Sequence, residues 1–416
     1  MLNAALEREL AYVVIIDGIE PIPGYDRVEH AIVGGWRVIV QKGQFKVGDP
    51  AIYFEIDSRV PSDKECFAFL EKRNYKVKTL KMCKTISQGL LMHASDFGWT
   101  IENKITPDAY GTCAIDTSVA IIDDEGQVHR PTDESRFLTK KLGVIYADDE
   151  DNTRKASSTD KYKKMTARHP NIFKKPWARW LMRREWGKKL MFFLFGKNKD
   201  KKNVWPDWVK KTDEERIENQ VWTLKNKDPW IVTEKIDGSS TTFTMRRGKF
   251  NKKNFYVCSR NVCFDNENKP CYYDTNIYLE MAKKYDMFNV LSRLLDTMPK
   301  AEWITIQGET YGEGVQRNTY GLIGHDFMAF NFITSDKGRW NSCMMKKILE
   351  EYNIPCVPIL NDSYVLPDTV AELREYVNSQ PSVVNGEMKE GIVCRSLDGV
   401  NSFKCVSPEY LIKYHG

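Results

Sequence analysis

The sequence predicts a small all-β domain followed by an α+β domain. Short strand-like runs separated by turn residues crowd the stretch from residue 10 to about 125, and closely spaced strands favour a barrel. From about Val204 onward, strand-like and helix-like apolar spacings follow one another without a regular βαβ repeat. An aperiodic stretch rich in Asp, Ser and Lys separates the two regions. We therefore place the domains at residues 1–130 and 204–416, joined by a connecting segment at 131–203.

The composition is that of a globular protein in a reducing compartment. Its 416 residues are 42% hydrophobic and 29% charged, with a formal net charge of +5, which argues against a disordered chain. The ten cysteines include no CxxC pair, and the six histidines have no ligand spacing with them, so a structural zinc site is not expected. No apolar run approaches the ~20 residues needed to cross a membrane, and no secretory-type N-terminus is present. We expect a cytoplasmic monomer with unpaired thiols and no membrane partner.

In the first domain, residues 36–40 and 51–56 are predicted as strands, separated by turn chemistry at Gly43 and at residues 47–50. Alternation along residues 76–81 places Lys76 and Lys78 on one face of a further strand. Two interpretations stay open for these lysines: contact with a phosphate backbone, or a merely solvated face.

The connecting segment contains an acidic run at 147–151 and then a basic, aromatic stretch. Residues 171–203 hold eleven Lys and Arg against two acidic residues, interleaved with Trp177, Trp180 and Trp186. Such a mixture suits nucleic-acid binding. We favour an amphipathic connecting helix whose aromatic residues pack on a neighbouring domain, and membrane-surface binding is a third, minor possibility.

In the second domain, apolar runs and their spacing predict several strands and two helices. The predicted strands are 221–232, 255–259, 303–310, 327–333, 391–395 and 402–406, and the predicted helices are 277–295 and 343–352.

The motif Lys235-Ile236-Asp237-Gly238 follows the strand-like residues 230–234. A lysine at this position can act as an amine nucleophile on a nucleoside triphosphate. The motif alone is weak, because chance supplies it easily. Its significance depends on six further elements that occur in a fixed order around it: residues 211–216, 259–261, 308–309, 327–332, 389–393 and 403–404.

Taken together, these elements resemble the ordered motifs of the covalent nucleotidyltransferases. More narrowly, the chain resembles the type 5 family of ATP-dependent RNA ligases, in which an OB-fold domain precedes an α+β nucleotidyltransferase domain of ATP-grasp-like character. The resemblance includes the N-terminal motifs at 34–36, 46–49, 53–58 and 86–90 and the central motif at 308–316. It covers most of the chain except the connecting segment.

The resemblance implies roles for particular residues. Lys235 would be the nucleophile that forms lysyl-AMP, and Glu234 would help to frame the adenine through its main chain. Phe330 would stack on the adenine, chosen over Phe327 and Phe332 because it precedes Asn331. Further positions are Glu309 near the ribose and metal, Ser240 as a polar residue of the later steps, and Arg216 as a contact to nucleotide or RNA.

The chemistry explains why carboxylates accompany the lysine. Attack requires a neutral amine, whereas a carboxylate alone stabilises the ammonium form. A Mg²⁺ or Mn²⁺ ion held by Asp237, Glu309 and Glu390 reverses that effect. Lys404 would supply positive charge towards the triphosphate and Arg260 towards a bound phosphate.

Each residue also has a plainer interpretation. Singly, Glu309, Glu390, Arg260 and Lys404 would be read as salt-bridge partners, and Phe330 as core. For Tyr311, Glu313 and Gln316, loop chemistry and substrate contact are equally compatible with the sequence. The chain also departs from the Lys-x-Lys spacing common at the last motif, since Lys404 is followed by Cys405 and Val406; either one lysine suffices or another, such as Lys413, assists.

The expected function is an ATP-dependent RNA ligase that joins 3′-OH and 5′-phosphate ends through lysyl-AMP and an adenylylated 5′ end. The expected partner is nicked RNA, or a nick with RNA on its 3′-OH side. The alternatives are a DNA ligase or a capping guanylyltransferase, which generally place the OB domain last, and a non-catalytic RNA-binding protein with a decayed nucleotide pocket.

Overall fold

The computed structural model describes residues 1–5, 7–102, 119–147, 170–173, 175–195, 205–211, 213–260, 262–264 and 275–415. The chain forms two compact units, each assembled from separate stretches of sequence. Unit 1 comprises Met1–Asp148, Thr212–Lys235 and Pro358–Gly416, and unit 2 comprises Asp149–Lys211 and Ile236–Val357. Within the predicted connecting segment at 131–203, residues 148–169 lie outside the described residues.

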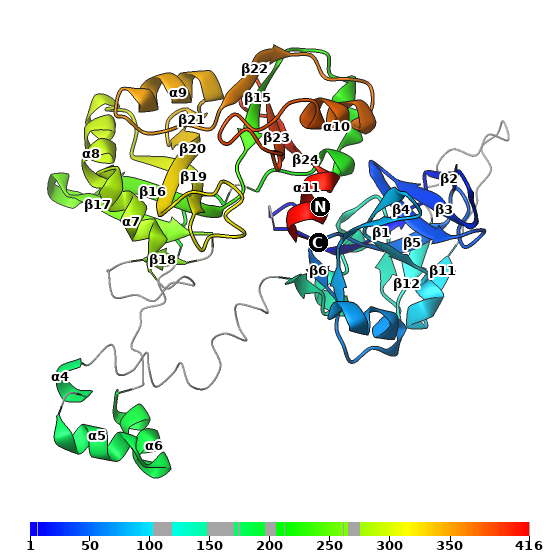
Figure 1. The fold of residues 1–416 in the computed structure, drawn as a ribbon, viewed down its shortest axis with the longest axis horizontal. Helices are drawn as coiled ribbons and strands as arrows, with labels where there is room; N and C mark the ends of the chain where they lie inside the picture. The colour runs from blue at the N-terminus through cyan, green and yellow to red at the C-terminus, as the bar shows by residue number, and fades with distance from the viewer. Residues whose placement is uncertain are drawn as a thin grey trace. The chain divides into compact units, whose positions relative to one another are not determined.

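The N-terminal part of unit 1 is built almost entirely from short strands (Figure 1). Its strands are β1 (Ala11–Ile15), β2 (Gly18–Ile22), β3 (Tyr25–Val33), β4 (Trp36–Gln41), β5 (Pro50–Phe54), β6 (Ser58–Arg59), β7 (Lys76–Val77), β8 (Thr79–Met82), β9 (Thr85–Gln88), β10 (Leu90–Met92), β11 (Thr100–Glu102), β12 (Ala120–Ile122), β13 (Val128–His129) and β14 (Ile145–Tyr146). Short helical turns connect them: η1 (Glu65–Arg73), η2 (Ala94–Phe97), η3 (Glu134–Arg136) and α1 (Thr139–Leu142). The strands predicted at 36–40 and 51–56 correspond to β4 and β5.

The strands of this part do not close into a continuous barrel among the described residues. Their strands pair into separate open sheets, including β1-β5-β10, β2-β3-β4 and β14-β6-β7. The central strand β5 is buried along its whole length, because it has apolar neighbours on both faces. Ile52 and Phe54 pack in one core cluster, whereas Ala51 and Tyr53 pack in another.

This β-rich part continues past residue 130. Leu138, Leu142 and Val144 belong to the same core cluster as Val13 and Ile52, and β14 pairs with β6. Residues up to Ala147 therefore pack with strands of the first domain, which the sequence predicts at 1–130.

The rest of unit 1 is an antiparallel sheet in the order β22-β15-β23-β24. This part of unit 1 contains η4 (Ile217–Asn219), η5 (Val221–Lys225), β15 (Trp230–Lys235), β22 (Ile359–Tyr364), α10 (Val370–Asn378), β23 (Gly391–Ser396), β24 (Ser402–Val406) and α11 (Pro408–His415). One face packs on α10 (Figure 1), where Trp230 and Phe403 meet Leu373 and Val377. The single strand predicted over 221–232 is wrong, because its first half forms η5 and β15 begins only at Trp230.

Unit 2 contains a sheet in the order β18-β17-β16-β19-β20-β21. Its elements are α4 (Pro170–Phe173), α5 (Pro176–Met182), α6 (Glu185–Phe195), β16 (Ser239–Arg247), η6 (Lys249–Asn251), β17 (Lys253–Ser259), β18 (Cys263–Phe264), α7 (Ile277–Lys284), α8 (Met287–Thr297), β19 (Trp303–Gly312), β20 (His325–Thr334), β21 (Gly338–Arg339) and α9 (Ser342–Glu350). The helix predicted at 277–295 is divided into α7 and α8, because Asp286 adopts a left-handed backbone conformation with φ 47°.

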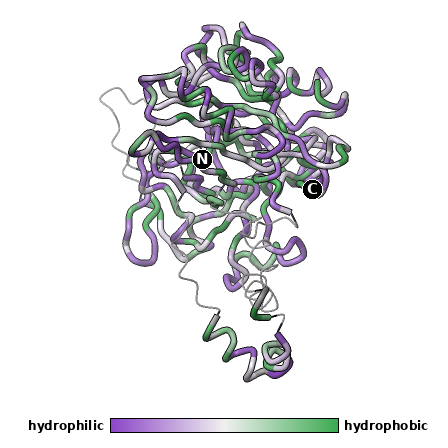
Figure 2. The backbone as a smooth tube through the Cα atoms, turned by 90° about the vertical axis from the view of Figure 1, so that its left-hand side faces the viewer, coloured by the Kyte–Doolittle hydropathy of each residue, from purple (hydrophilic) through white to green (hydrophobic). Residues whose placement is uncertain are grey.

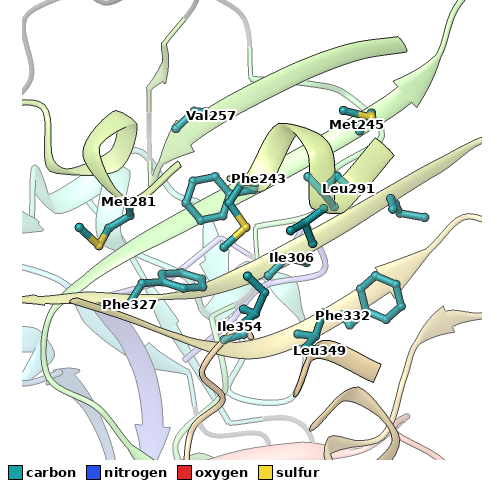
Figure 3. Close-up of a cluster of buried hydrophobic side chains, with 14 of the residues drawn as sticks. Phe243, Met245, Val257, Met281, Leu291, Ile306, Phe327, Phe332, Leu349 and Ile354 are labelled. Atoms are coloured by element: carbon teal, nitrogen blue, oxygen red, sulfur yellow. The ribbon is translucent and has the colours of Figure 1, made fainter. Parts of the chain in front are cut away.

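The core of unit 2 lies between one face of this sheet and the helices α7, α8 and α9. Figure 3 shows Phe243, Ile306 and Phe332 from the strands in one cluster with Leu291 and Leu349 from the helices. Successive strand residues point to opposite faces, and on the other face of β16 and β19 many side chains are polar, among them Thr242, Thr244 and Gln307. Along the backbone, hydrophobic and hydrophilic residues are therefore closely interspersed (Figure 2).

The basic, aromatic stretch forms three helices, α4, α5 and α6, where the sequence predicts a single connecting helix. Trp177, Trp180 and Trp186 are each about half exposed, at 49%, 50% and 53%, and their packing on a neighbouring domain stays a prediction. Ala178 and Met191 form a small cluster of their own. No helix among the described residues is long and apolar enough to cross a membrane.

Candidate active site

Lys235 is the last residue of β15, and strand alternation determines the direction of its side chain. Trp230 and Val232 face the core against α10, so Thr233 and Lys235 point to the other face. Lys404 shares that face, since it pairs with Val393, which in turn pairs with Thr233. The sheet thus presents both predicted lysines on the face that is not covered by α10.

The Lys235 ammonium forms an ion pair with Glu390. Lys235 Nζ lies 2.7 Å from Glu390 Oε2, and the two side chains are 25% and 12% exposed. The carboxylate precedes β23, whose first residue Gly391 pairs with Lys235. A side chain at Gly391 has no room, because a Cβ there would collide with the Cys405 carbonyl. This close approach of β23 and β24 brings Glu390 to the end of β15.

Lys404 forms a second buried ion pair. Its Nζ lies 2.6 Å from Asp213 Oδ1, and the residue is 8% exposed. Burial lowers the pKa of Lys404, an effect that Asp213 opposes. Lys413, the other lysine considered for this motif, lies on α11 over the Tyr414 ring at 4.7 Å.

The turn after Lys235 is held by residues to which the sequence assigns no role. The Asp237 amide donates to the Tyr320 hydroxyl at 2.9 Å, and Gln316 Nε2 donates to the Gly238 carbonyl at 3.2 Å. Tyr320 itself packs edge-on against Tyr311. The sequence does not indicate these contacts, because only the fold brings residues 311–320 to this turn.

Glu309 lies directly beside the same turn. A Cβ at Gly238 would come within 2.9 Å of Glu309 Cγ and 2.5 Å of the Thr310 carbonyl oxygen. Ser240 pairs with Glu309 across β16 and β19, so the two side chains share the polar face of the sheet. The structure therefore brings Asp237, Ser240 and Glu309 together in unit 2.

Phe330 differs from its two aromatic neighbours in burial. Phe327 and Phe332 are fully buried members of the core, whereas Phe330 is half-buried and lies outside that cluster. A bulge between Gln307 and Gly308 causes the difference, since it shifts the register of β20 at Phe330. The plain interpretation of Phe330 as a core residue is wrong, and its stacking on adenine stays a prediction.

Glu234 is a buried residue with structural partners. Its carboxylate accepts hydrogen bonds from the Ser382 hydroxyl and from the Val383 amide, and its own amide donates to the Pro358 carbonyl at 2.9 Å. These contacts fix the end of β15 immediately before Lys235. Contact with the adenine remains a prediction.

Arg216 and Arg260 occupy contrasting positions. Arg216 is buried, pairs with Asp57 at 3.2 Å and lies over the Trp36 ring. It therefore connects residues 213–216 to the strand-rich part of unit 1, and its contact to nucleotide or RNA stays a prediction. Arg260 is exposed at the end of β17. Lys78, expected on an open face, donates instead to the His415 carbonyl at 3.0 Å.

The predicted metal ligands are all carboxylates, the oxygen donors that Mg²⁺ and Mn²⁺ prefer. Among the residues that the structure describes, no group of three or more His, Cys, Asp or Glu side chains forms a ready metal cage. Mg²⁺ commonly binds one or two carboxylates and takes its remaining ligands from water and substrate phosphates. Carboxylates such as Glu309 of unit 2 and Glu390 of unit 1 are each of the type that suits this mode of binding, and their shared role as metal ligands stays a prediction.

Two family models match the chain. Residues 10–94 match an OB-fold domain model, and residues 228–415 match the model described as RNA ligase. No curated protein matches the chain.

Solved structures of an RNA ligase from Naegleria gruberi share the fold. The form with pyrophosphate is 23% identical, with a TM-score of 0.67, covering 98% of this chain and 99% of that chain. A variant with ATP and manganese gives the same identity and TM-score over 98% of this chain and 100% of that chain. A variant with AMP and manganese is 24% identical, with a TM-score of 0.66, covering 98% and 99%. The likeness establishes an N-terminal OB fold followed by a ligase fold.

Proposed function

We propose that the chain is an RNA ligase, since residues 228–415 match the model of that family, and that it joins RNA ends with ATP, through lysyl-AMP formed on Lys235. The observation that carries the proposal is the pairing of Lys235 with Glu390 at 2.7 Å, at the strand end that precedes the Asp237-Gly238 turn. RNA is the substrate class of the family. The finer assignments, to a nick in a duplex and to action as a monomer, are part of the proposal.

In the first step, the Lys235 amine attacks the α-phosphate of ATP, a bond forms between Nζ and phosphorus, and pyrophosphate leaves. The ammonium must first lose a proton, and Glu390 in its present contact opposes that loss. A divalent ion held by Glu390 and Glu309 would supply positive charge that favours the neutral amine and stabilises the phosphate oxygens. The Naegleria gruberi structures with ATP, AMP and manganese support this choice of donor and ion.

In the second step, a 5′-phosphate oxygen of the RNA attacks the lysyl-AMP phosphorus, which releases Lys235 and gives an adenylylated 5′ end. In the third, the 3′-OH attacks the 5′-phosphate and AMP leaves. Lys404, on the same sheet face as Lys235, supplies fixed positive charge towards phosphate. Ser240, opposite Glu309, is the polar residue proposed for the later steps. Both roles are positioning and electrostatic, which suits phosphoryl transfer.

The test is to incubate the protein with ATP or GTP labelled on the α-phosphate, with Mg²⁺ or Mn²⁺, and to look for a denaturation-stable adduct. We expect labelling with ATP that is lost in Lys235→Ala and in Lys235→Arg. Labelling that persists in Lys235→Ala would exclude Lys235 as the nucleophile. Sealing of nicks with RNA or DNA on each side then tests the substrate, and equal sealing of an all-DNA nick would contradict an RNA requirement.

A further inference from the structure

Unit 1 contains a cavity that the chemistry around Lys235 does not use. Its volume is about 750 Å³, and its walls come from β3, β4, β8, β9, η5 and α10 together with the turns at their ends. Neither Lys235 nor Glu390 nor Lys404 lines it. It is large enough for a nucleotide.

The cavity has an excess of positive charge. Its lining includes five basic side chains, Arg37, Lys81, Lys84, Lys225 and Arg374, against three acidic ones, Asp368, Glu375 and Glu409. Arg37 pairs with Glu20 at 3.2 Å and Arg374 with Glu218 at 2.7 Å, so the positive charge available to a ligand comes from the three lysines.

Some of these acidic groups are already occupied. Asp368 pairs with Lys227 at 2.7 Å, and Glu409 accepts a hydrogen bond from Asn378. By contrast, Lys81, Lys84 and Lys225 are exposed and form no ion pair within the described part of the chain. Lysines that approach a cavity from separate elements without carboxylate partners suit an anionic ligand.

The position of Lys84 is maintained at an energetic cost. Met82 pairs with Thr85, so Cys83 and Lys84 form the two-residue turn of the β8–β9 hairpin. Both have positive φ, 52° and 57°, the conformation in which hairpins usually carry Asn-Gly. Neither residue here is glycine, and each costs on the order of 1 kcal/mol in this conformation. The turn nevertheless places a lysine at the cavity.

Buried donors without acceptors lie in the cavity wall. Gln88 is 1% exposed, and its Nε2 has no hydrogen-bond partner among the described residues. Its Oε1 accepts from Arg374 Nη2 at 2.7 Å, which orients the amide nitrogen as the free donor. Arg374 Nε is likewise without a partner in the described part of the chain. An unsatisfied buried donor costs about 1–3 kcal/mol. Both nitrogens are buried in the wall, so a ligand oxygen would accept from them only after a local shift of the wall.

The remaining wall suits a sugar or a base. Ile32, Ile86 and Leu224 give it apolar surface. The helix α10 begins in the wall with its cap Thr369, and the first amides of a helix, here at Val370 and Ala371, have no acceptor within the helix. A nucleotide unit fits these features if its phosphate lies at the lysines and its ring lies against the apolar side chains.

We propose that this cavity binds a nucleotide unit of the RNA strand, separately from the AMP carried by Lys235. The proposal rests on the proposed function for the substrate class. An RNA strand is favoured over a free nucleotide because the lysines approach from three separate elements, β8, the hairpin turn and η5, as an extended polyanion requires.

The experiment measures binding of a fluorescent single-stranded RNA by anisotropy, with the full chain and without ATP, as a function of salt. The first variant, Lys81→Gln with Lys84→Gln, removes two charges from the cavity. The second, Ala371→Trp, fills the cavity from an exposed helix position without changing the charge. The matched control, Lys42→Gln with Lys72→Gln, removes two exposed charges from the same part of unit 1, outside the cavity.

We expect the lysine pair to weaken RNA binding by about tenfold and to reduce the salt slope by about 1.4, or about 0.7 for each phosphate that a lysine no longer neutralises. Ala371→Trp should weaken binding comparably, and the control should have little effect. Formation of the Lys235 adduct should stay at the wild-type level in all variants, so absence of that adduct in the wild type would count against the proposed function alone.

Three outcomes would overturn the proposal. The lysine pair and its control would weaken binding equally if only long-range charge mattered. Ala371→Trp would leave binding unchanged if the cavity were empty in the complex. A variant that binds RNA normally but needs more ATP for adduct formation would assign the cavity to a free nucleotide.

Discussion

Glu390 holds Lys235 as an ammonium ion, with 2.7 Å between Nζ and Oε2. The carboxylate that favours the unreactive form of the nucleophile is also one of the predicted metal ligands. This contact keeps the amine protonated and unreactive in the absence of metal. A divalent ion bound to Glu390 would remove that effect, which is why an ion is expected for the reaction.

Glu390→Gln separates these two effects. Loss of the carboxylate should make the Lys235 amine more reactive towards a general amine reagent at neutral pH, because the ammonium loses its counter-ion. Adduct formation with ATP should nevertheless fall by about 10² or more, since a metal ligand is removed. Mass spectrometry of the modified lysine and labelling with α-phosphate-labelled ATP measure the two quantities. If amine reactivity and adduct formation both rose, Glu390 would not be a metal ligand.

Gly238→Ala tests the close packing beside Glu309. The new methyl group would lie 2.5 Å from the Thr310 carbonyl oxygen, so the turn after Lys235 must move. Misplacement of reacting groups by about 1 Å can cost about 10² in rate, and we expect a decrease of that size in adduct formation. Gly18→Ala is the control, because its Cβ would meet only Ile32 at an ordinary 3.6 Å. Equal rates for both variants would show that the turn tolerates displacement.

Tyr320→Phe removes the hydroxyl that accepts from the Asp237 amide at 2.9 Å. Tyr320 acts as a positioning residue, so the rate of lysyl-AMP formation should fall by about tenfold, equivalent to about 1.4 kcal/mol. We expect this decrease in the rate constant at saturating ATP rather than in the ATP concentration that gives half the maximal rate. Single-turnover kinetics over a range of ATP concentrations distinguishes these. An effect on ATP affinity alone would place Tyr320 in nucleotide binding instead.

Asp213→Asn leaves the buried Lys404 cation without its partner. At neutral pH we expect a decrease in stability of about 2 kcal/mol, below the roughly 3–5 typical of fully buried pairs, because the Asp213 side chain is 24% exposed. Burial already lowers the pKa of Lys404 in the folded protein, and the substitution should lower it further. The Lys404 amine then binds a proton more readily in the unfolded chain than in the folded one. The loss of stability caused by the substitution should therefore shrink as pH rises through the folded pKa of Lys404, which lies below 10.5.

Urea unfolding of this variant and of the wild type, at neutral and at alkaline pH, measures that change. A penalty that stays constant with pH would show that Asp213 stabilises the fold by some route other than its charge.

The buried Glu55 carboxylate should make the stability of the fold sensitive to acid. Burial alone would raise its pKa, but the N-terminal ammonium, Arg8 and Arg216 lower the pKa to about 2 from 4.5. A depressed carboxyl pKa gives stability that is present above pH 4.5 and is lost as pH falls towards 2, amounting to about 3 kcal/mol. Glu55→Gln should be less stable at neutral pH and should lack this acid transition. Urea unfolding between pH 2 and 6 checks both expectations; an unchanged acid profile would assign the sensitivity to other groups.

Local patterning was sufficient for most strands of the second domain. The predicted strand at 402–406 coincides with β24, and that at 255–259 lies within β17. Their apolar residues alternate at the period that a half-buried strand requires. The strand predicted over 221–232 was wrong in its first part, because η5 buries the apolar residue Leu224 by a helical turn, which the same local pattern also permits.

Contacts between residues distant in the chain could not be predicted from local sequence patterns. Nothing near Tyr320 in the chain indicates that its hydroxyl meets the Asp237 amide, and nothing near Gln88 indicates that Arg374 orients it. Such contacts depend on which elements the fold brings side by side.

The linear sequence was enough to predict Lys235 as the nucleophile, through the ordered motifs and the resemblance that they carry, and to predict the two-part architecture, because residue type, spacing and periodicity are properties of the chain itself. Tertiary structure alone decided that Lys404 shares the Lys235 face of the sheet, that Glu390 pairs with the nucleophile, and that Arg216 serves the OB-fold part of unit 1. The physical reason is that each of these relations depends on strand register and on packing between segments distant in the sequence, which local periodicity does not specify.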